Sequence, residues 1–202
     1  EVLGIKPEDV AVGSTGVIGQ TMNIRAIESG IQAAAAFLSR DGSDSAARAI
    51  MTTDTVKKEF AVSTMIGGKS VKIGGISKGS GMIHPNMGTM LCFITTDCAI
   101  SKAMAKAALK EAVRVSFNRI SVDGDTSTND TCVILANGMA GNAEIKAKDE
   151  DFEVFIAALT EICVKLARAM AKDGEGAKHL ITCDVAGAKS EKQAEAIGKS
   201  II

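Results

Sequence analysis

The sequence contains no tryptophan or tyrosine and only six phenylalanines among its 202 residues. Proteins that hold single-stranded nucleic acid stack the bases on aromatic side chains, so this scarcity argues against such a role. The charge distribution also argues against nucleic-acid binding, because 23 basic and 24 acidic side chains leave a net charge of −1 and form no basic stripe. We therefore expect no nucleic-acid partner.

Long apolar runs are also missing. No stretch approaches the roughly 20 apolar residues that a membrane helix needs, and the opening residues carry no charged segment followed by an apolar signal core. We expect no membrane partner and a cytoplasmic location.

Cysteine and histidine do not occur in metal-binding or catalytic patterns. The five cysteines make an odd set with no CxxC pair, and His84 and His179 are far apart in the sequence. These spacings do not indicate a disulfide framework, a zinc site or a Ser-His triad. We predict reduced, buried cysteines, no metal and no cofactor.

Hydrophobic residues make up 46% of the chain, enough to fill a sizeable core. The pattern predicts strands at 9–14, in a hairpin over 60–77 that turns at Gly67-Gly68, and at 89–97, 119–125, 131–138 and 179–188. It predicts helices that begin near Asn23, after a cap at Asp97 or Ser101, over 150–172, and after a capping box from Ser190 to Gln193. Hairpins beside amphipathic helices, with little strict βαβ alternation, favour a layered α+β fold.

A glycine-rich stretch, GSTGVIG at 13–19, admits three interpretations. As a dinucleotide-binding turn it lacks the acidic residue expected about 20 residues later, where the sequence is helical. It could be a plain structural turn. The interpretation that fits best is an oxyanion hole, formed by the Thr15 hydroxyl and the Gly16 amide as adjacent hydrogen-bond donors.

The polar loop DGDTSTND at 123–130 suggests a calcium site but fails the EF-hand pattern. Its sixth position is Thr128, where glycine is needed, and its twelfth is Ile134, where a glutamate is needed. A hydrogen-bonded turn rich in Asp, Ser and Thr is the better interpretation.

The pair Gly88-Thr89 precedes an apolar run and has two interpretations. Thr89 could be an ordinary β-branched strand residue. Alternatively, its hydroxyl attacks the Gly88 carbonyl and the chain cuts itself, leaving Thr89 as a new N-terminus. The freed amine, with an ordinary pKa of roughly 8, would then serve as general base for its own hydroxyl, which removes the need for a histidine.

Five motifs in order along the chain resemble the arginine-biosynthesis ornithine acetyltransferase family, also called glutamate N-acetyltransferase: GSTGVIG, AIMTTDT, KGSGMIHPNMGTMLCFITTD, SVDGDTSTNDT and DGEGAKH. The resemblance implies an α/β/β/α sandwich of the type shared with self-cleaving aminopeptidases. It implies that residues 1–202 are a partial main catalytic domain, with 1–88 the end of an α chain and 89–202 the start of a β chain. Family precursors are considerably longer, so we expect an internal piece that lacks the opening NSGNAN region and the C-terminal part of the pocket.

The resemblance also implies an activity. The precursor cuts itself before the threonine of its PNM-(A/G)-TML motif, and this threonine carries acetyl from N²-acetylornithine to glutamate. Some members also use acetyl-CoA. No metal or cofactor takes part, and the α and β chains stay associated, as an α2β2 assembly.

Site residues follow from the matching motifs. Lys78 suits a substrate carboxylate, or is a solvated loop lysine; Glu175 suits the cationic end of ornithine, or is a surface acid beyond a helix. Thr52 forms a hydrogen bond to substrate, or caps a turn. The complete implied set is Thr15 and Gly16 as oxyanion hole, Gly88 and Thr89 as cleavage site, Thr89 as nucleophile, and Thr52, Lys78, Thr89 and Glu175 as substrate-binding residues.

Two rival functions stay open at this stage. A self-processed aminopeptidase-like hydrolase would use the same nucleophile with water as acceptor. A small-ligand binding module would use the glycine-rich turns to hold phosphate.

Overall fold

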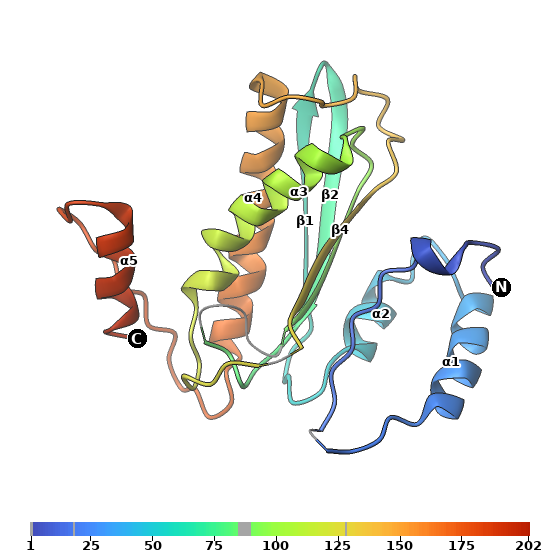
Figure 1. Ribbon diagram of the computed structural model, residues 1–202, viewed down its shortest axis with the longest axis horizontal. Coiled ribbons are helices and arrows are strands. Elements are labelled where there is room, and N and C mark those ends of the chain that lie inside the picture. Colours follow the sequence, from blue (N-terminus) through green and yellow to red (C-terminus); the bar gives the residue numbers. More distant parts are fainter. Residues whose placement is uncertain (1, 18, 85–89, 128) are drawn as a thin grey trace.

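The computed structural model describes residues 2–17, 19–84, 90–127 and 129–202, and its fold is mixed α+β (Figure 1). The strands form one four-stranded sheet in the order β1 (Lys58–Ile66), β2 (Lys69–Lys78), β3 (Leu91–Thr96) and β4 (Thr131–Ala136). The helices are α1 (Ile24–Ala36), α2 (Ser43–Ala49), α3 (Lys102–Arg114), α4 (Glu150–Lys172) and α5 (Glu191–Lys199), with short 3-10 turns η1 (Pro7–Asp9) and η2 (Phe117–Arg119). The predicted α+β class is confirmed.

The first two strands form the predicted hairpin. Gly67 and Gly68 have φ angles of 54° and 73°, a left-handed conformation that glycine adopts without steric cost and that two-residue hairpin turns require. β2 then pairs antiparallel with β3, and β3 pairs parallel with β4. The hairpin and strands at 91–96 and 131–136 are therefore confirmed.

The core lies between the sheet and α4. Figure 1 shows α3 and α4 covering the same face of the sheet, and buried α4 residues such as Leu159 and Leu166 are fully enclosed. Gly75 of β2 permits the close packing, because a Cβ there would lie 3.1 Å from Leu166 Cδ1 and 3.4 Å from Ile162 Cγ2. α4 therefore sits directly on the strand that ends in Lys78.

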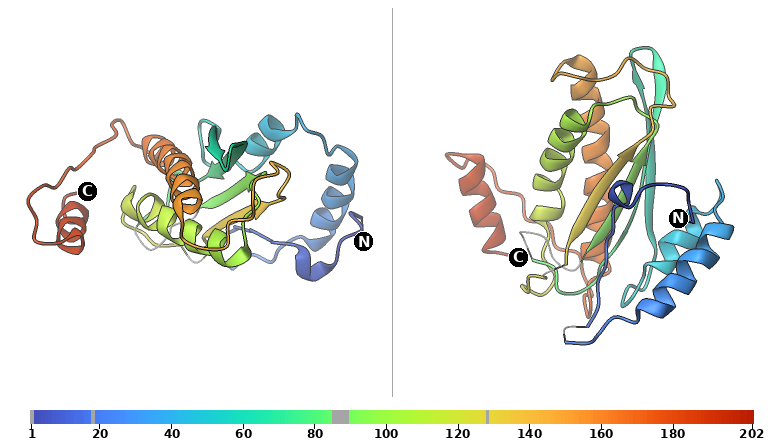
Figure 2. Two further views of the ribbon diagram at one scale, coloured as in Figure 1. Left: turned by 90° about the horizontal axis from the view of Figure 1, so that it is seen from above. Right: turned by 45° about the vertical axis from the view of Figure 1, so that its right-hand side comes forward.

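The outer helices are less enclosed. Figures 1 and 2 place α1 apart from the sheet on the side away from α4, and α5 beyond α3 and α4 at the opposite end. Neither helix has a buried residue. Among the described residues, no helix is both long and apolar enough to cross a membrane.

Helix caps follow the predicted chemistry, and the structure selects one of the two residues predicted to cap α3. Ser101, not Asp97, caps α3, accepting a hydrogen bond from the Met104 amide at 3.4 Å. Asp97 instead accepts from the Lys72 amide of β2 at 2.7 Å. Ser190 caps α5 as predicted, and α4 spans the predicted 150–172.

Three predicted strands, at 9–14, 119–125 and 179–188, are wrong. A strand needs a neighbour for its backbone hydrogen bonds, and none of the three ranges pairs with a strand in the described parts of the chain. In range 119–125, Arg119 ends η2 and residues 120–125 form a loop, in which the Val122 amide donates to the Ile83 carbonyl at 2.8 Å. The described residues form a single sheet, so the finer α/β/β/α layering stays a prediction.

Candidate functional site

Three predicted substrate-binding residues from distant parts of the sequence lie in one cluster. The Lys78 ammonium, at the end of β2, donates to the Thr52 hydroxyl at 3.2 Å. The amide of Glu175, which follows α4, donates to the Ser80 carbonyl at 2.7 Å. A Cβ built on Gly81 would lie only 2.7 Å from Glu175 Oε2, so this carboxylate rests directly against the 80–81 turn. The structure therefore brings a cation, a hydroxyl and an anion together beside the end of one strand.

Lys78 is not the solvated loop lysine of the alternative interpretation. It is 3% exposed, and burial lowers the pKa of its ammonium while the nearby Asp54 carboxylate opposes that shift. Within the described ranges, the Lys78 ammonium has one hydrogen-bond partner, the Thr52 hydroxyl. An ammonium carries three donors, so Lys78 retains donors for an incoming anion.

A buried ion network lies beside this cluster. The Lys58 ammonium, at the start of β1, contacts Asp54 Oδ1 and Asp173 Oδ2, each at 2.6 Å, and its side chain has no exposed surface. Burial alone would raise the pKa of both carboxyl groups. Hydrogen bonds outweigh it and hold both pKa values below the ordinary range: for Asp54 they come from Gly79 and Lys58, and for Asp173 from Lys58 and Thr55.

The predicted oxyanion pair lies on the N-terminal segment before α1. Thr15 is half-buried and Gly16 is exposed. Two residues earlier, a Cβ on Gly13 would lie 3.3 Å from Leu91 Cδ2 and 3.4 Å from Thr131 Cγ2, the side chains that begin β3 and β4. This segment therefore runs past the end of the sheet at which β3 starts.

Gly88 and Thr89, the predicted cleavage site, lie outside the described residues. The loop at 121–131 holds the chain on both sides of them. Asp123 accepts from the Met82 amide and, at 3.1 Å, from the Ile83 amide, while Asp130 accepts from the Met90 amide at 3.0 Å. The loop is thus the hydrogen-bonded turn that the sequence favoured over a calcium site.

Asp130 is the aspartate of this loop that holds the Met90 amide. Burial raises the pKa of its carboxyl to about 6, although the hydrogen bond from Met90 opposes the shift. His84, which ends the preceding described stretch, pairs through Nδ1 with the Ser121 hydroxyl at 3.1 Å. The same loop therefore contacts three consecutive residues, 82–84, as well as Met90.

Cys92, Cys98 and Cys163 have raised pKa values, which disfavour the reactive thiolate form. All five cysteines are free, and burial raises the pKa of Cys98 to about 11. The pKa of Cys92 is also raised, first by a hydrogen bond with Cys132 and then by burial. Protonated thiols are poor nucleophiles. No group of three metal-ligating side chains occurs among the residues that the structure places.

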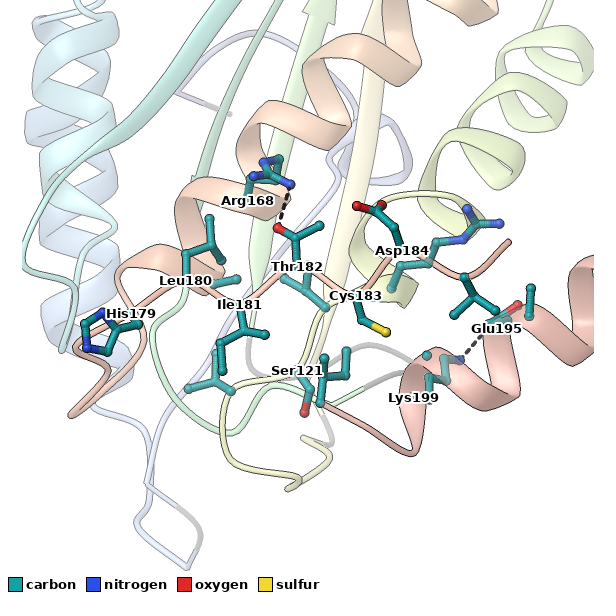
Figure 3. A pocket seen from close by; sticks show the side chains of 18 of the residues that line it. Ser121, Arg168, His179, Leu180, Ile181, Thr182, Cys183, Asp184, Glu195 and Lys199 are labelled. Carbon is teal, nitrogen blue, oxygen red and sulfur yellow. Dashed lines mark hydrogen bonds and ion pairs between the residues drawn. The ribbon is translucent and has the colours of Figure 1, made fainter. Parts of the chain in front are cut away.

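A pocket of 560 Å³ lies elsewhere, between α5, the 177–185 segment and the 119–122 loop. Figure 3 shows Arg168 hydrogen-bonded to Thr182, and Lys199 paired with Glu195, beside it. Of the predicted substrate-binding residues that the structure describes, Thr52, Lys78 and Glu175, none lines this pocket. It is therefore separate from the cluster around Lys78.

Sequence reasoning missed the network of Asp54, Lys58 and Asp173. One signal was present, because Asp54 is the aspartate of the TTDT motif and Lys58 follows it four residues later. Asp173 is the residue directly after α4, and only the packing of α4 on β1 brings it to Lys58.

Comparison with known proteins gives consistent matches. A sequence model described as "ArgJ family" matches residues 1–202. The "Arginine biosynthesis bifunctional protein ArgJ" of Bacillus licheniformis is 50% identical over 202 residues, which cover 100% of this chain and 49% of the relative. The protein of the same description from Symbiobacterium thermophilum is 50% identical over 201 residues, which cover 100% of this chain and 50% of the relative. The protein of the same description from Synechocystis is 47% identical over 199 residues, which cover 98% of this chain and 48% of the relative.

The chain spans about half the length of the curated relatives it matches. Among solved structures, the crystal structure of "Arginine biosynthesis bifunctional protein argJ" from Bacillus halodurans is 44% identical, with a TM-score of 0.41, and covers 43% of this chain and 40% of that one.

Proposed function

The chain belongs to the ArgJ family, and from this premise we propose that it is part of an acetyltransferase of arginine biosynthesis. The proposed reaction moves an acetyl group from N²-acetylornithine to glutamate. The observation that carries the proposal is the cluster of Thr52, Lys78 and Glu175, which three distant segments bring to one place. A cation and an anion on one site match an amino acid with a carboxylate at one end and an ammonium at the other.

Self-cleavage is the first step of the proposed reaction. Thr89 Oγ attacks the Gly88 carbonyl carbon, the Gly88–Thr89 C–N bond breaks, and the nitrogen takes the hydroxyl proton. Water then hydrolyses the resulting ester, which leaves a carboxylate on Gly88 and a free hydroxyl and amine on Thr89.

Acetyl transfer follows in two half-reactions. Thr89 Oγ attacks the acetyl carbonyl of acetylornithine while its own amine takes the proton, and ornithine leaves as the protonated amine. The α-amine of glutamate then attacks the acetyl-Thr89 ester, acetylglutamate leaves, and the hydroxyl is restored. The Thr15 hydroxyl and Gly16 amide stabilise the oxyanion in both steps.

The remaining residues bind the substrate in this proposal. Lys78, with donors left after its bond to Thr52, takes the substrate carboxylate, and Glu175 takes the side-chain ammonium of ornithine. Acetyl-CoA is a further acetyl donor in the proposal. We place the enzyme in the cytoplasm as an α2β2 assembly of the two chains.

Mass spectrometry of the full-length protein tests the proposal. After incubation with N²-acetylornithine, the fragment that begins at Thr89 should gain 42 Da, roughly the mass of one acetyl group, and lose it when glutamate is added. Thr89→Ala should abolish both cleavage and acetylation. Thr15→Ala should cleave and fold but turn over roughly 10²- to 10³-fold more slowly.

The aminopeptidase-like hydrolase predicts a different product. With glutamate present, it would release acetate in place of acetylglutamate. Acetate as the main product, or a Thr89 fragment that never gains acetyl, would defeat the transferase.

A further inference from the structure

Lys58 is a buried cation that the proposed reaction does not use. Its ammonium contacts Asp54 Oδ1 and Asp173 Oδ2 at 2.6 Å each and the Val56 carbonyl at 3.3 Å. These three acceptors match its three N–H donors, so no donor remains for a substrate. With a fully enclosed side chain, Lys58 acts only through its neighbours.

One side of the network leads to Thr52 and Lys78. Asp54 Oδ2 accepts from the Thr52 amide at 3.2 Å, and Oδ1 accepts from the Gly79 amide at 2.8 Å. Gly79 directly follows Lys78. A single carboxylate therefore fixes the backbone of both residues that form the cationic side of the cluster.

The other side leads to Glu175. Asp173 accepts from the amide and hydroxyl of Thr55, and its Oδ2 is 3.0 Å from that amide. Two residues later, the Glu175 amide is bonded to the Ser80 carbonyl, and the Ser80 hydroxyl lies 2.6 Å from Thr53 Oγ1. The end of α4 is thereby tied to the turn that carries Thr52.

We propose, on the basis of the proposed function, that Lys58 is a positioning residue that sets the separation between the Lys78 ammonium and the Glu175 carboxylate. It joins the carboxylate that fixes Lys78 to the carboxylate that precedes Glu175. That separation selects the length of the substrate, an amino acid with a cationic end. Lys58 thus determines specificity without touching the ligand.

Lys57 provides a matched control. It is the adjacent lysine of the same sequence run, its side chain is 34% exposed, and it pairs with Asp44 at 2.5 Å and Glu59 at 2.8 Å. Among the residues that the structure describes, its ion-pair partners include neither Asp54 nor Asp173. Its removal deletes a charge and two ion pairs at the neighbouring position but leaves the network of Asp54, Lys58 and Asp173 intact.

The experiment compares Lys58→Met, Lys58→Arg and Lys57→Met in the full-length enzyme. Steady-state kinetics are measured with N²-acetylornithine and with N-acetylnorvaline, which lacks the terminal amine, and self-cleavage is followed on a denaturing gel. For Lys58→Met we expect complete cleavage, a rise in KM for acetylornithine of about tenfold or more, and kcat within about threefold. The preference for acetylornithine over acetylnorvaline should shrink by about tenfold, because only acetylornithine depends on the correct position of Glu175.

The companion variants should separate positioning from general stability. Lys58→Arg, which keeps a cation with several donors, should recover part of the preference, and Lys57→Met should retain all of it. If Lys58→Met does not fold, the same kinetics are measured with Asp173→Asn, which removes one ion pair of Lys58 while keeping an acceptor oxygen. The same loss of preference for acetylornithine is expected.

Two results would overturn the inference. If the unmodified enzyme is active and a folded Lys58 or Asp173 variant keeps its substrate preference, the role proposed for Lys58 is wrong but the proposed function stands. Absence of any acetyl transfer by the unmodified full-length enzyme would defeat the proposed function as well.

Discussion

Gly81 leaves the space that the Glu175 carboxylate occupies. A Cβ on Gly81 would lie 2.7 Å from Glu175 Oε2 and 3.0 Å from its Cδ, closer than atoms of the two groups can approach. Since Glu175 is a surface side chain with rotamer freedom, it would move away at small energetic cost. The position of a candidate substrate-binding carboxylate thus depends on a missing methyl group.

Gly81→Ala should lower kcat/KM for N²-acetylornithine by about tenfold in the full-length enzyme, because the displaced carboxylate no longer meets the substrate ammonium. The free energy of unfolding should change by less than about 1 kcal/mol. Gly74→Ala is the control, since its Cβ would meet nothing nearer than 4.0 Å. Equal kinetics for the two variants would contradict the assigned role of Glu175.

Lys58 also matters for stability and its pH dependence. The pKa values of Asp54 and Asp173 are lowered in the fold, so their contribution is present above their ordinary pKa near 3.8 and is lost as the pH falls below it. Lys58→Met leaves both carboxylates buried without a counter-ion, and we expect a loss of about 3–5 kcal/mol at pH 7.

Urea unfolding at pH 7 and pH 4 checks this prediction. Without Lys58 the two carboxyl groups should take up protons on acidification, so the deficit of Lys58→Met relative to the unmodified protein should shrink at pH 4. A deficit that is the same at both pH values would show that lost packing, not charge, is the cause.

Among the elements, the loop at 121–131 has the clearest relation to the candidate cleavage site. Asp123 holds residues 82 and 83, and Asp130 holds Met90, so its two ends fix the chain on either side of residues 85–89. Self-cleavage requires the hydroxyl and the carbonyl to meet in a constrained geometry.

Asp130→Ala should therefore slow self-cleavage of the full-length precursor by about tenfold or more, measured as the half-time of band conversion on a gel. Asp130→Asn, which keeps an acceptor oxygen for Met90, should cleave faster than the alanine variant. Asp125→Ala, an exposed residue of the same loop, should cleave normally. If all three variants cleave at the unmodified rate, the loop does not position the cleavage site.

Local chemistry predicted several elements and failed for others for identifiable reasons. The Gly67-Gly68 turn and the apolar face of α4 are properties of contiguous residues, so the hairpin and the bounds 150–172 followed from the sequence. Ranges 9–14 and 179–188 have strand-like composition, but pairing depends on a neighbour that composition does not supply. The Lys58 network was missed for the same reason, since Asp173 is separated from Lys58 by 115 positions.

At the scale of the whole molecule, the motif resemblance to the family is confirmed, whereas the roles of individual residues stay predictions. The described chain also exposes an apolar helix face. Ile24, Ile27 and Ile31 of α1 are 56%, 41% and 52% exposed, and they lie on one side of the helix. Because the relatives are about twice as long, we expect the rest of the protein to cover this face.

Ile27→Asp tests that expectation by comparing two lengths of protein. In the full-length enzyme it should lower the free energy of unfolding by about 2–4 kcal/mol, because a buried methyl-rich side chain is replaced by a charge. In the 202-residue chain, where Ile27 is already exposed, the change should be within about 0.5 kcal/mol. Equal effects in both would show that α1 is not covered. Glu28→Gln, a change on the same helix, is the control for helix propensity.

The strand order implies that the two fragments of the proposed self-cleavage stay bound to each other. A break between Gly88 and Thr89 would divide the sheet into two strands from each fragment, with the six-residue β2–β3 ladder as the seam and the Lys58–Asp173 ion pair as a second link across it. The two fragments could dissociate only if the backbone hydrogen bonds between β2 and β3 were broken. Mature halves would therefore resist subunit exchange under native conditions and come apart only when the whole domain melts.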